Sequence, residues 1–158
     1  PLTGTETGRP MLLRLPGSKL SIANLMRSQL YGAIATLKIG MDMLAREEQV
    51  ESDILLGHGG FFKTPEVGQR VLSAAIDTPV SVMETAGEGG PYGMALLCAY
   101  MLWKEDETLE DYLDNVVFHG CKSVTVTADQ KEVDGFNKFI EDYKACLNVE
   151  KEAIKCWN

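Results

Sequence analysis

The sequence has fewer positive than negative charges and no long apolar run, and its first residues show no secretory-signal pattern. Its 158 residues carry a formal net charge of -8, which argues against binding to a nucleic-acid backbone, because that needs clustered Lys and Arg. No stretch approaches the roughly 18 consecutive apolar residues of a membrane-spanning helix. The first residues lack the basic and then apolar pattern of a secretory signal. We therefore expect a cytoplasmic protein without nucleic-acid or membrane partners.

Motifs for metals and disulfides are also scarce. The four cysteines contain no CxxC pair and are widely spaced: Cys98, Cys121, Cys146 and Cys156. Of the two histidines, His58 lies far from all of them, and His119 lies two residues before Cys121. These spacings argue against a zinc site. Two disulfides would suit a secreted protein, but a chain of this length can bury a core without them. Between these alternatives we favour reduced thiols.

The rest of the sequence has an ordinary globular composition and predicts one α/β domain over residues 1–158. A strand, a helix and a second strand in succession form a βαβ unit, so the two strands should be parallel. In the first half of the chain we expect an arm or edge strand within 1–20, an amphipathic helix from Ser21, a strand at 53–57 and a helix started by Thr64 and Pro65. In the second half we expect a strand at 79–83, a buried apolar helix at 94–103 and a helix capped by Thr108. A strand or arm at 122–129 and a last helix capped by Thr127 complete the prediction.

Two glycine-rich loops follow the two predicted parallel strands. The first, "GHGGFFKTP", holds Gly59 and Gly60, and the second is "ETAGEGGPYG". Parallel strands end at one edge of a sheet, where ligands bind, so the two loops should lie together. Glycines allow a ligand to approach the backbone, and a helix start favours phosphate. A glycine pair after a strand is more often a simple turn, and both interpretations stay open at this point.

Other polar residues of these loops offer less. Lys63 could reach an anion, although an exposed lysine is the commoner case. His58 fits a hydrogen-bonded packing histidine better than a ligand. Glu84 and Glu88 are expected to be solvated, and Gly93 to let its helix approach the sheet. No pair of residues stands out as a general acid and base, so we assign no catalytic residue and no metal ligand.

Three segments occur in an informative order: "NLMRSQLYGAIATLK", then "GGFFKTPEVGQ" with "PVSVM", then "PYGMALLCAYM". Over about residues 20–104 this order resembles the C-terminal region of the FGGY carbohydrate kinases, and the xylulokinases and ribulokinases in particular. The resemblance implies the actin/hexokinase-like (ribonuclease H-like) ATPase fold. It also implies ATP, Mg²⁺ and a sugar, here a ketopentose such as xylulose or ribulose, as ligands.

By position, the resemblance assigns four residues to the nucleotide. Gly59 and Gly60 would pass the backbone beneath the adenosine and α-phosphate, and Thr64 would lie beside the nucleotide. Lys63 occupies a position that is frequently basic in the family. Three features depart from the family pattern: His58 in place of a common glycine, Phe61 and Phe62 after the pair, and Tyr31 in place of a glutamate.

The resemblance also implies what lies outside these residues. The family's DxGTT-like phosphate loop and catalytic aspartate are not found in this sequence. We therefore expect a C-terminal portion of a two-domain kinase, inactive alone, with its base in an N-terminal part; a homodimer is compatible with the resemblance. Two alternatives remain at this point: a non-catalytic actin-like regulatory or scaffolding domain, and an unrelated flavodoxin-like binding domain.

Overall fold

The computed structural model describes residues 3–103 and 106–156. The chain divides into two compact units. We call the first the helical unit, which comprises residues 1–52, 71–77 and 128–158, and the second the sheet unit, which comprises 53–70 and 78–127. The boundary between them passes through helix α2 (Val67–Ile76).

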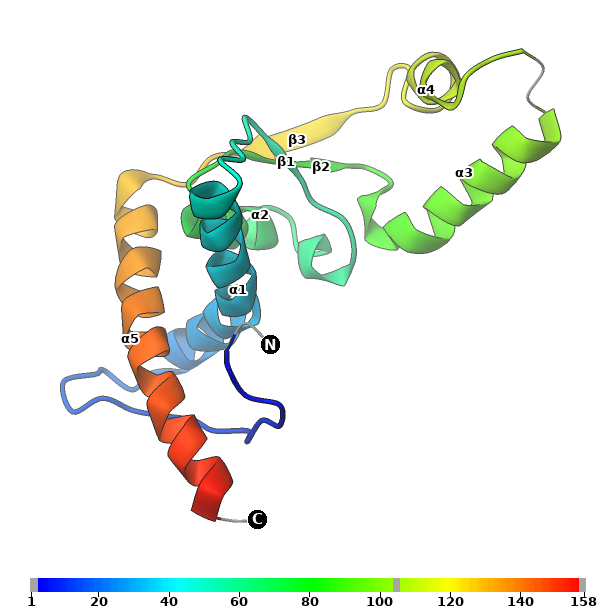
Figure 1. Ribbon diagram of the computed structural model, residues 1–158. Coiled ribbons are helices and arrows are strands. Elements are labelled where there is room, and N and C mark those ends of the chain that lie inside the picture. The colour runs from blue at the N-terminus through cyan, green and yellow to red at the C-terminus, as the bar shows by residue number, and fades with distance from the viewer. Residues whose placement is uncertain (1–2, 104–105, 157–158) are drawn as a thin grey trace. The chain divides into compact units, whose positions relative to one another are not determined.

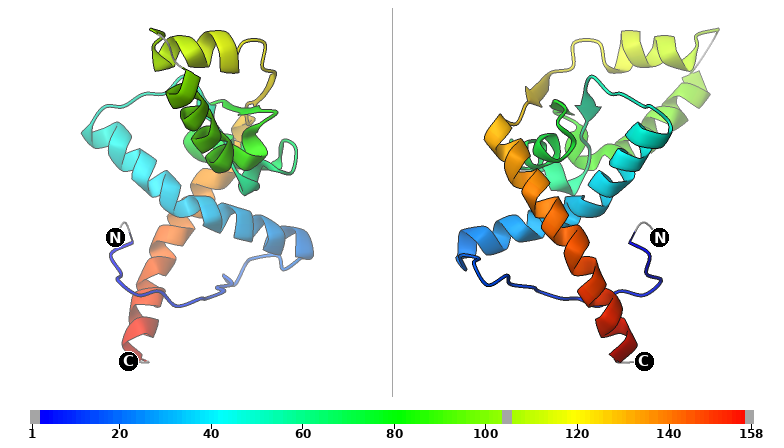
Figure 2. Two further views of the ribbon diagram at one scale, coloured as in Figure 1. Left: turned by 90° about the vertical axis from the view of Figure 1, so that its right-hand side faces the viewer. Right: turned by 60° about the vertical axis from the view of Figure 1, so that its left-hand side comes forward.

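The helical unit is built on two long helices, α1 (Ile22–Glu47) and α5 (Gln130–Cys156), which cross each other in all views (Figures 1 and 2). Helix α1 begins where the sequence predicts, because the Ser21 hydroxyl accepts a hydrogen bond from the Asn24 N–H group at 3.2 Å. The preceding residues 11–15 form an arm and no strand, and their large apolar side chains are exposed.

Aromatic packing between these helices forms the core of the helical unit. Phe136 is fully buried, and the Tyr31 ring of α1 lies 4.8 Å from it and 5.2 Å from the Phe139 ring. The buried residues of α5 are Val133, Phe136 and Ile140, whose three- and four-residue spacing places them on one face of the helix. Burial raises the pKa of the Tyr31 hydroxyl, because the phenolate form would lose its hydration.

The start of α5 differs from the prediction. The Asp129 carboxylate accepts from the Glu132 N–H group at 2.9 Å, and the Glu132 carboxylate accepts from the Asp129 N–H group at 3.0 Å. This reciprocal pair is a capping box. Thr127 lies two residues too early and does not cap the helix, so that part of the prediction is wrong. Ser73 of α2 supports the same turn, because its hydroxyl accepts from the Ala128 N–H group at 2.9 Å.

The sheet unit contains three strands in the order β1 (Leu55–Leu56), β2 (Val80–Met83) and β3 (Ser123–Val126), shown in Figure 1. Strands β1 and β2 are parallel, with Leu55 opposite Val80, as predicted. Strand β3 is antiparallel to β2. Buried Gln69 stabilises this sheet, because its side-chain amide donates to the Val80 carbonyl at 3.1 Å and the Val124 carbonyl at 2.7 Å.

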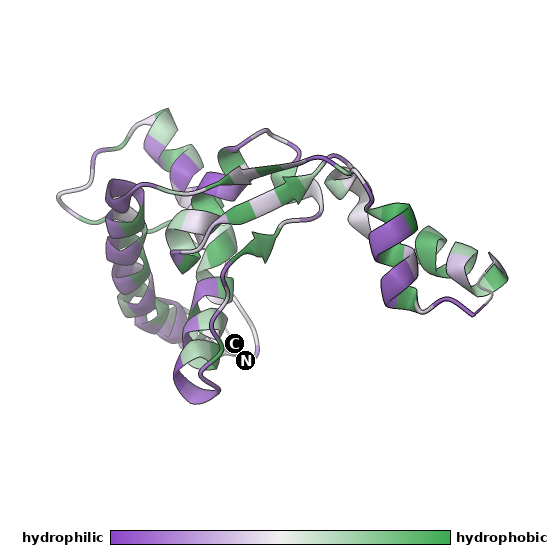
Figure 3. Cartoon of the chain, turned by 90° about the horizontal axis from the view of Figure 1, so that it is seen from above, coloured by the Kyte–Doolittle hydropathy of each residue, from purple (hydrophilic) through white to green (hydrophobic). Residues whose placement is uncertain are grey.

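Helix α3 (Gly89–Trp103) is apolar along most of its length (Figure 3) and was expected to be buried. That expectation is wrong: none of its described residues is buried, and Met101 and Trp103 are 75% and 76% exposed. Apolar composition indicates that a surface avoids water, but it does not indicate which residues cover it. None of the described helices combines the length and apolar content that a membrane crossing requires.

A short helical segment follows α3. Helix α4 (Leu109–Tyr112) has the predicted cap, since the Thr108 hydroxyl accepts from the Asp111 N–H group at 3.1 Å, and it continues into the π-helix η3 (Leu113–Val117). The Tyr100 ring of α3 lies 5.4 Å from the Tyr112 ring. The Tyr100 hydroxyl also donates to the Glu107 carbonyl at 2.9 Å.

The two candidate caps of α5 can be distinguished by mutation. We expect Asp129→Ala to lower the free energy of unfolding by about 1 kcal/mol, because it leaves helix N–H groups without an acceptor. Thr127→Ala, the matched control, should change it by less than about 0.5 kcal/mol. Urea unfolding followed by circular dichroism measures both. A larger loss for Thr127→Ala would show that the cap is assigned to the wrong residue.

Candidate functional site

Gly59 has a backbone conformation that only glycine adopts readily. Its φ is +95° and its ψ is −172°. The Gly59 N–H group donates to the Ala86 carbonyl at 2.7 Å, and its carbonyl accepts from the Phe62 N–H group at 3.1 Å. Glycine is therefore required at position 59 by the local fold itself.

Gly60 presents the opposite case. It begins the 3-10 helix η1 (Gly60–Phe62), and its φ lies outside the left-handed range. A Cβ atom built at Gly60 would have no described atom of the sheet unit within 4 Å. Neither the backbone conformation nor packing in this unit demands glycine there, so Gly60 leaves an open stretch of backbone.

Two phenylalanine side chains pack against glycines on either side of this loop. The Phe62 ring lies 2.7 Å from the position that a Gly57 Cβ would take, so position 57 has no room for a side chain. A Cβ at Gly68 would likewise collide with the Phe61 carbonyl oxygen and ring. The two rings meet edge to face at 5.4 Å. Phe61 and Phe62 therefore stabilise the loop by packing against these two glycines. The sequence did not predict this role.

The helix after the loop starts later than predicted. Thr64 and Pro65 precede α2 and do not open it, because Glu66 has a φ of +63°, which a right-handed helix excludes. The Glu66 carbonyl accepts the first helical hydrogen bond, from the Arg70 N–H group at 2.8 Å. The prediction of Thr64 as N-cap is wrong. Thr64 is instead exposed on the turn between η1 and α2.

The second glycine-rich loop contacts the first, as expected. It comprises the 3-10 helix η2 (Ala86–Glu88) and the start of α3, and Ala86 is buried. A Gly87 Cβ would lie 3.7 Å from the Lys63 Cε atom, so the stem of exposed Lys63 runs along this loop. A Gly89 Cβ would lie 3.0 Å from both the Cβ and Nδ1 atoms of His58.

Two single-residue predictions for these loops are wrong. His58 is exposed, and its imidazole makes no hydrogen bond within the part of the chain that the structure describes, although it does pack on Gly89. Gly93 has no described atom within 4 Å of a Cβ position, so it does not serve close packing of α3. In both cases the sequence suggested a buried environment that the sheet unit does not provide.

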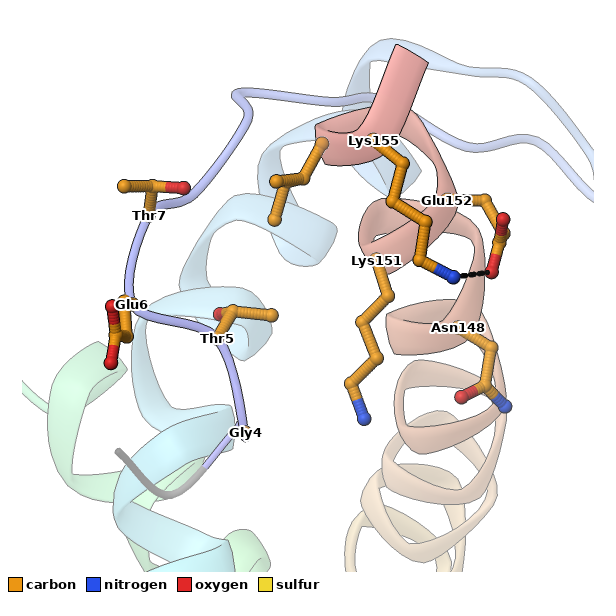
Figure 4. A pocket seen from close by; sticks show the side chains of 9 residues that line it. Gly4, Thr5, Glu6, Thr7, Asn148, Lys151, Glu152 and Lys155 are labelled. Carbon is orange, nitrogen blue, oxygen red and sulfur yellow. Dashed lines mark hydrogen bonds and ion pairs between the residues drawn. The ribbon is translucent and has the colours of Figure 1, made fainter. Parts of the chain in front are cut away.

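A separate cavity of about 620 Å³ lies in the helical unit, between the arm Gly4–Thr7 and the last turns of α5 (Figure 4). Its charged lining residues balance: Lys151 and Lys155 against Glu6 and Glu152, with Lys155 paired to Glu152 at 2.6 Å. None of the predicted site residues lines it. Because its charges cancel and its wall is an arm without secondary structure, we prefer the glycine loops as the functional site.

The glycine loops lie beyond the ends of two parallel strands, which places the site in the class of α/β ligand-binding sites at a sheet edge. Residues 3–102 match the family described as the FGGY family of carbohydrate kinases, C-terminal domain. The chain therefore belongs to the FGGY family of carbohydrate kinases, which are ATP-dependent sugar kinases that use Mg²⁺, and its fold is the actin-like ATPase fold. No curated protein sequence and no solved structure matches the chain.

The different roles of the glycines predict different effects on stability. We expect Gly68→Ala to lower the free energy of unfolding by about 1–3 kcal/mol, because the new methyl group collides with the Phe61 backbone. Gly60→Ala should leave it unchanged within about 0.5 kcal/mol. Thermal and urea unfolding of both variants tests this. An equal loss in Gly60→Ala would contradict the open environment of that residue.

Proposed function

We propose that this chain is the nucleotide-binding C-terminal part of an ATP-dependent sugar kinase, in which Gly59, Gly60, Lys63 and Thr64 contact the nucleotide. The observation that carries the proposal is the open backbone at Gly60. Among the glycines at positions 57–68, Gly59 is explained by its backbone conformation. Gly57 and Gly68 are explained by contact with the Phe62 and Phe61 side chains, whereas Gly60 is explained by neither. A ligand that lies against the backbone gives that glycine a purpose.

Lys63 and Thr64 suit the same ligand. Both follow η1 directly and are exposed. The Lys63 ammonium is a cation for the phosphates. The Thr64 hydroxyl does not cap α2 and is therefore available for a hydrogen bond to the nucleotide. The corrected start of α2 thus supports the assignment of Thr64, although for a different reason than the sequence suggested.

Mg²⁺ is expected to arrive with the nucleotide. Among residues 3–103 and 106–156, no group of three or more His, Cys, Asp or Glu side chains could hold a metal ion. Mg²⁺ keeps several waters and binds substrate phosphates with only one or two carboxylates. That this chain supplies no metal ligand and no catalytic residue remains a prediction from the sequence.

The complete enzyme is proposed to transfer the ATP γ-phosphoryl group to a hydroxyl of a ketopentose, xylulose or ribulose. Phosphoryl transfer of this kind depends mainly on positioning and charge stabilisation. The ketopentose rests on the resemblance to xylulokinases and ribulokinases alone, and the catalytic base is assigned to an N-terminal domain of a two-domain kinase. Residues 1–158 would then be one domain of a cytoplasmic enzyme, and a homodimer would be compatible with this assignment.

Nucleotide binding can be measured directly on the chain. We expect isothermal titration calorimetry to show saturable binding of Mg²⁺–ADP. We expect Gly60→Val to abolish this binding, because the branched side chain would occupy the open space beside the backbone that we assign to the nucleotide. Gly93→Val is the matched control, since its environment is equally open but lies within α3. Binding that survives Gly60→Val would refute the loop assignment.

The proposed placement of the nucleotide site in this chain and of the catalytic base in an N-terminal domain predicts which proteins phosphorylate sugars. The 158-residue chain alone should phosphorylate no sugar, because the base is assigned elsewhere. A coupled assay with the full-length enzyme and a panel of pentoses, hexoses and polyols should show the highest kcat/KM for xylulose or ribulose. A hexose or polyol preference would overturn the substrate assignment, and robust phosphorylation by the chain alone would overturn the placement of the base.

A further inference from the structure

The two glycine-rich loops interlock at three points. The Gly59 N–H group donates to the Ala86 carbonyl, the Lys63 stem runs beside Gly87, and His58 packs directly on Gly89. Each contact joins a residue of the first loop to one of the second. The spacing of the loops is therefore set by side-chain and backbone contacts, in addition to the pairing of β1 and β2.

Gly89 is a glycine because of His58. Its φ of −53° and ψ of −40° are ordinary helical values that any residue adopts, so backbone conformation does not require glycine there. The three nearest atoms to a Gly89 Cβ all belong to His58, at 3.0 to 3.2 Å. One of them is the His58 Cβ, which is fixed to the backbone, so rotation of the imidazole cannot relieve the collision. A methyl group at Gly89 would therefore require His58 to move by a few tenths of an ångström, its Cβ atom included.

Separation of the loops would act on Gly59. The unusual conformation of Gly59 is held by its hydrogen bond to Ala86, three residues before Gly89. When the second loop moves away, this bond lengthens and Gly59 can relax towards commoner conformations. The backbone of Gly60 then changes its direction as well. The spacing set by His58 and Gly89 therefore controls the surface that we assign to the nucleotide.

We infer that His58 is a positioning residue of the nucleotide site: its contact with Gly89 fixes the second loop on the first and so holds the Gly59–Gly60 backbone in its binding conformation. This inference rests on the proposed nucleotide-binding function. It gives His58, which replaces a common family glycine, a role without any contact to the reacting atoms.

The test uses the chain with three readouts: the dissociation constant for Mg²⁺–ADP, hydrogen exchange of the Gly59 amide, and the free energy of unfolding. Gly89→Ala should weaken ADP binding about 10-fold and speed Gly59 exchange by a similar factor, the scale of a modest overpacking. Gly93→Ala, the matched control in the same helix, should change neither, because a Cβ there meets nothing.

The double variant His58→Gly/Gly89→Ala separates positioning from a general loss of stability. The His58→Gly change removes the three atoms nearest to the new methyl group, so the double variant should bind ADP no worse than His58→Gly alone. Additive losses would overturn the inference, and so would a loss of stability in Gly89→Ala with ADP binding unchanged. Absence of ADP binding in the unmodified chain would instead refute the proposed function, on which the inference rests.

Discussion

The hydrogen bond from the Gly59 N–H group to the Ala86 carbonyl joins two loops that follow different strands, and the candidate site depends on it. It holds Gly59 in a conformation that other residues avoid. Phe61 and Phe62 support the loop from the opposite side through Gly57 and Gly68. Gly60 is left as an open position on this backbone. We propose that the nucleotide lies against it.

Local signals predicted most of the elements. The amphipathic pattern from Ser21 predicted the start of α1, and the strand–helix–strand order predicted the parallel pairing of β1 with β2. The meeting of the two loops followed from that pairing. These features depend on neighbours in the sequence or on a simple rule of topology, which is why the sequence sufficed.

The errors involved non-local or competing interactions. Thr64 is a residue type that often caps helices, but the left-handed backbone conformation of Glu66 delays the start of α2 to Val67. Asp129 competed with Thr127 for the start of α5 and formed the better pair with Glu132. The exposure of α3 depends on which residues cover it, which hydropathy does not encode. The contact of His58 with Gly89 joins residues far apart in the sequence, and no local sequence pattern predicts it.

We propose that the nucleotide binds at the Gly59–Gly60 loop of the sheet unit. Titration of the ¹⁵N-labelled chain with Mg²⁺–ADP, followed by two-dimensional NMR, tests it most directly. We predict that the largest amide shift changes occur at Gly59–Thr64, with smaller ones at Ala86–Gly89. Changes concentrated instead at the arm Gly4–Thr7 and at Lys151 of α5 would place the ligand in the cavity of the helical unit and contradict binding at the glycine loops.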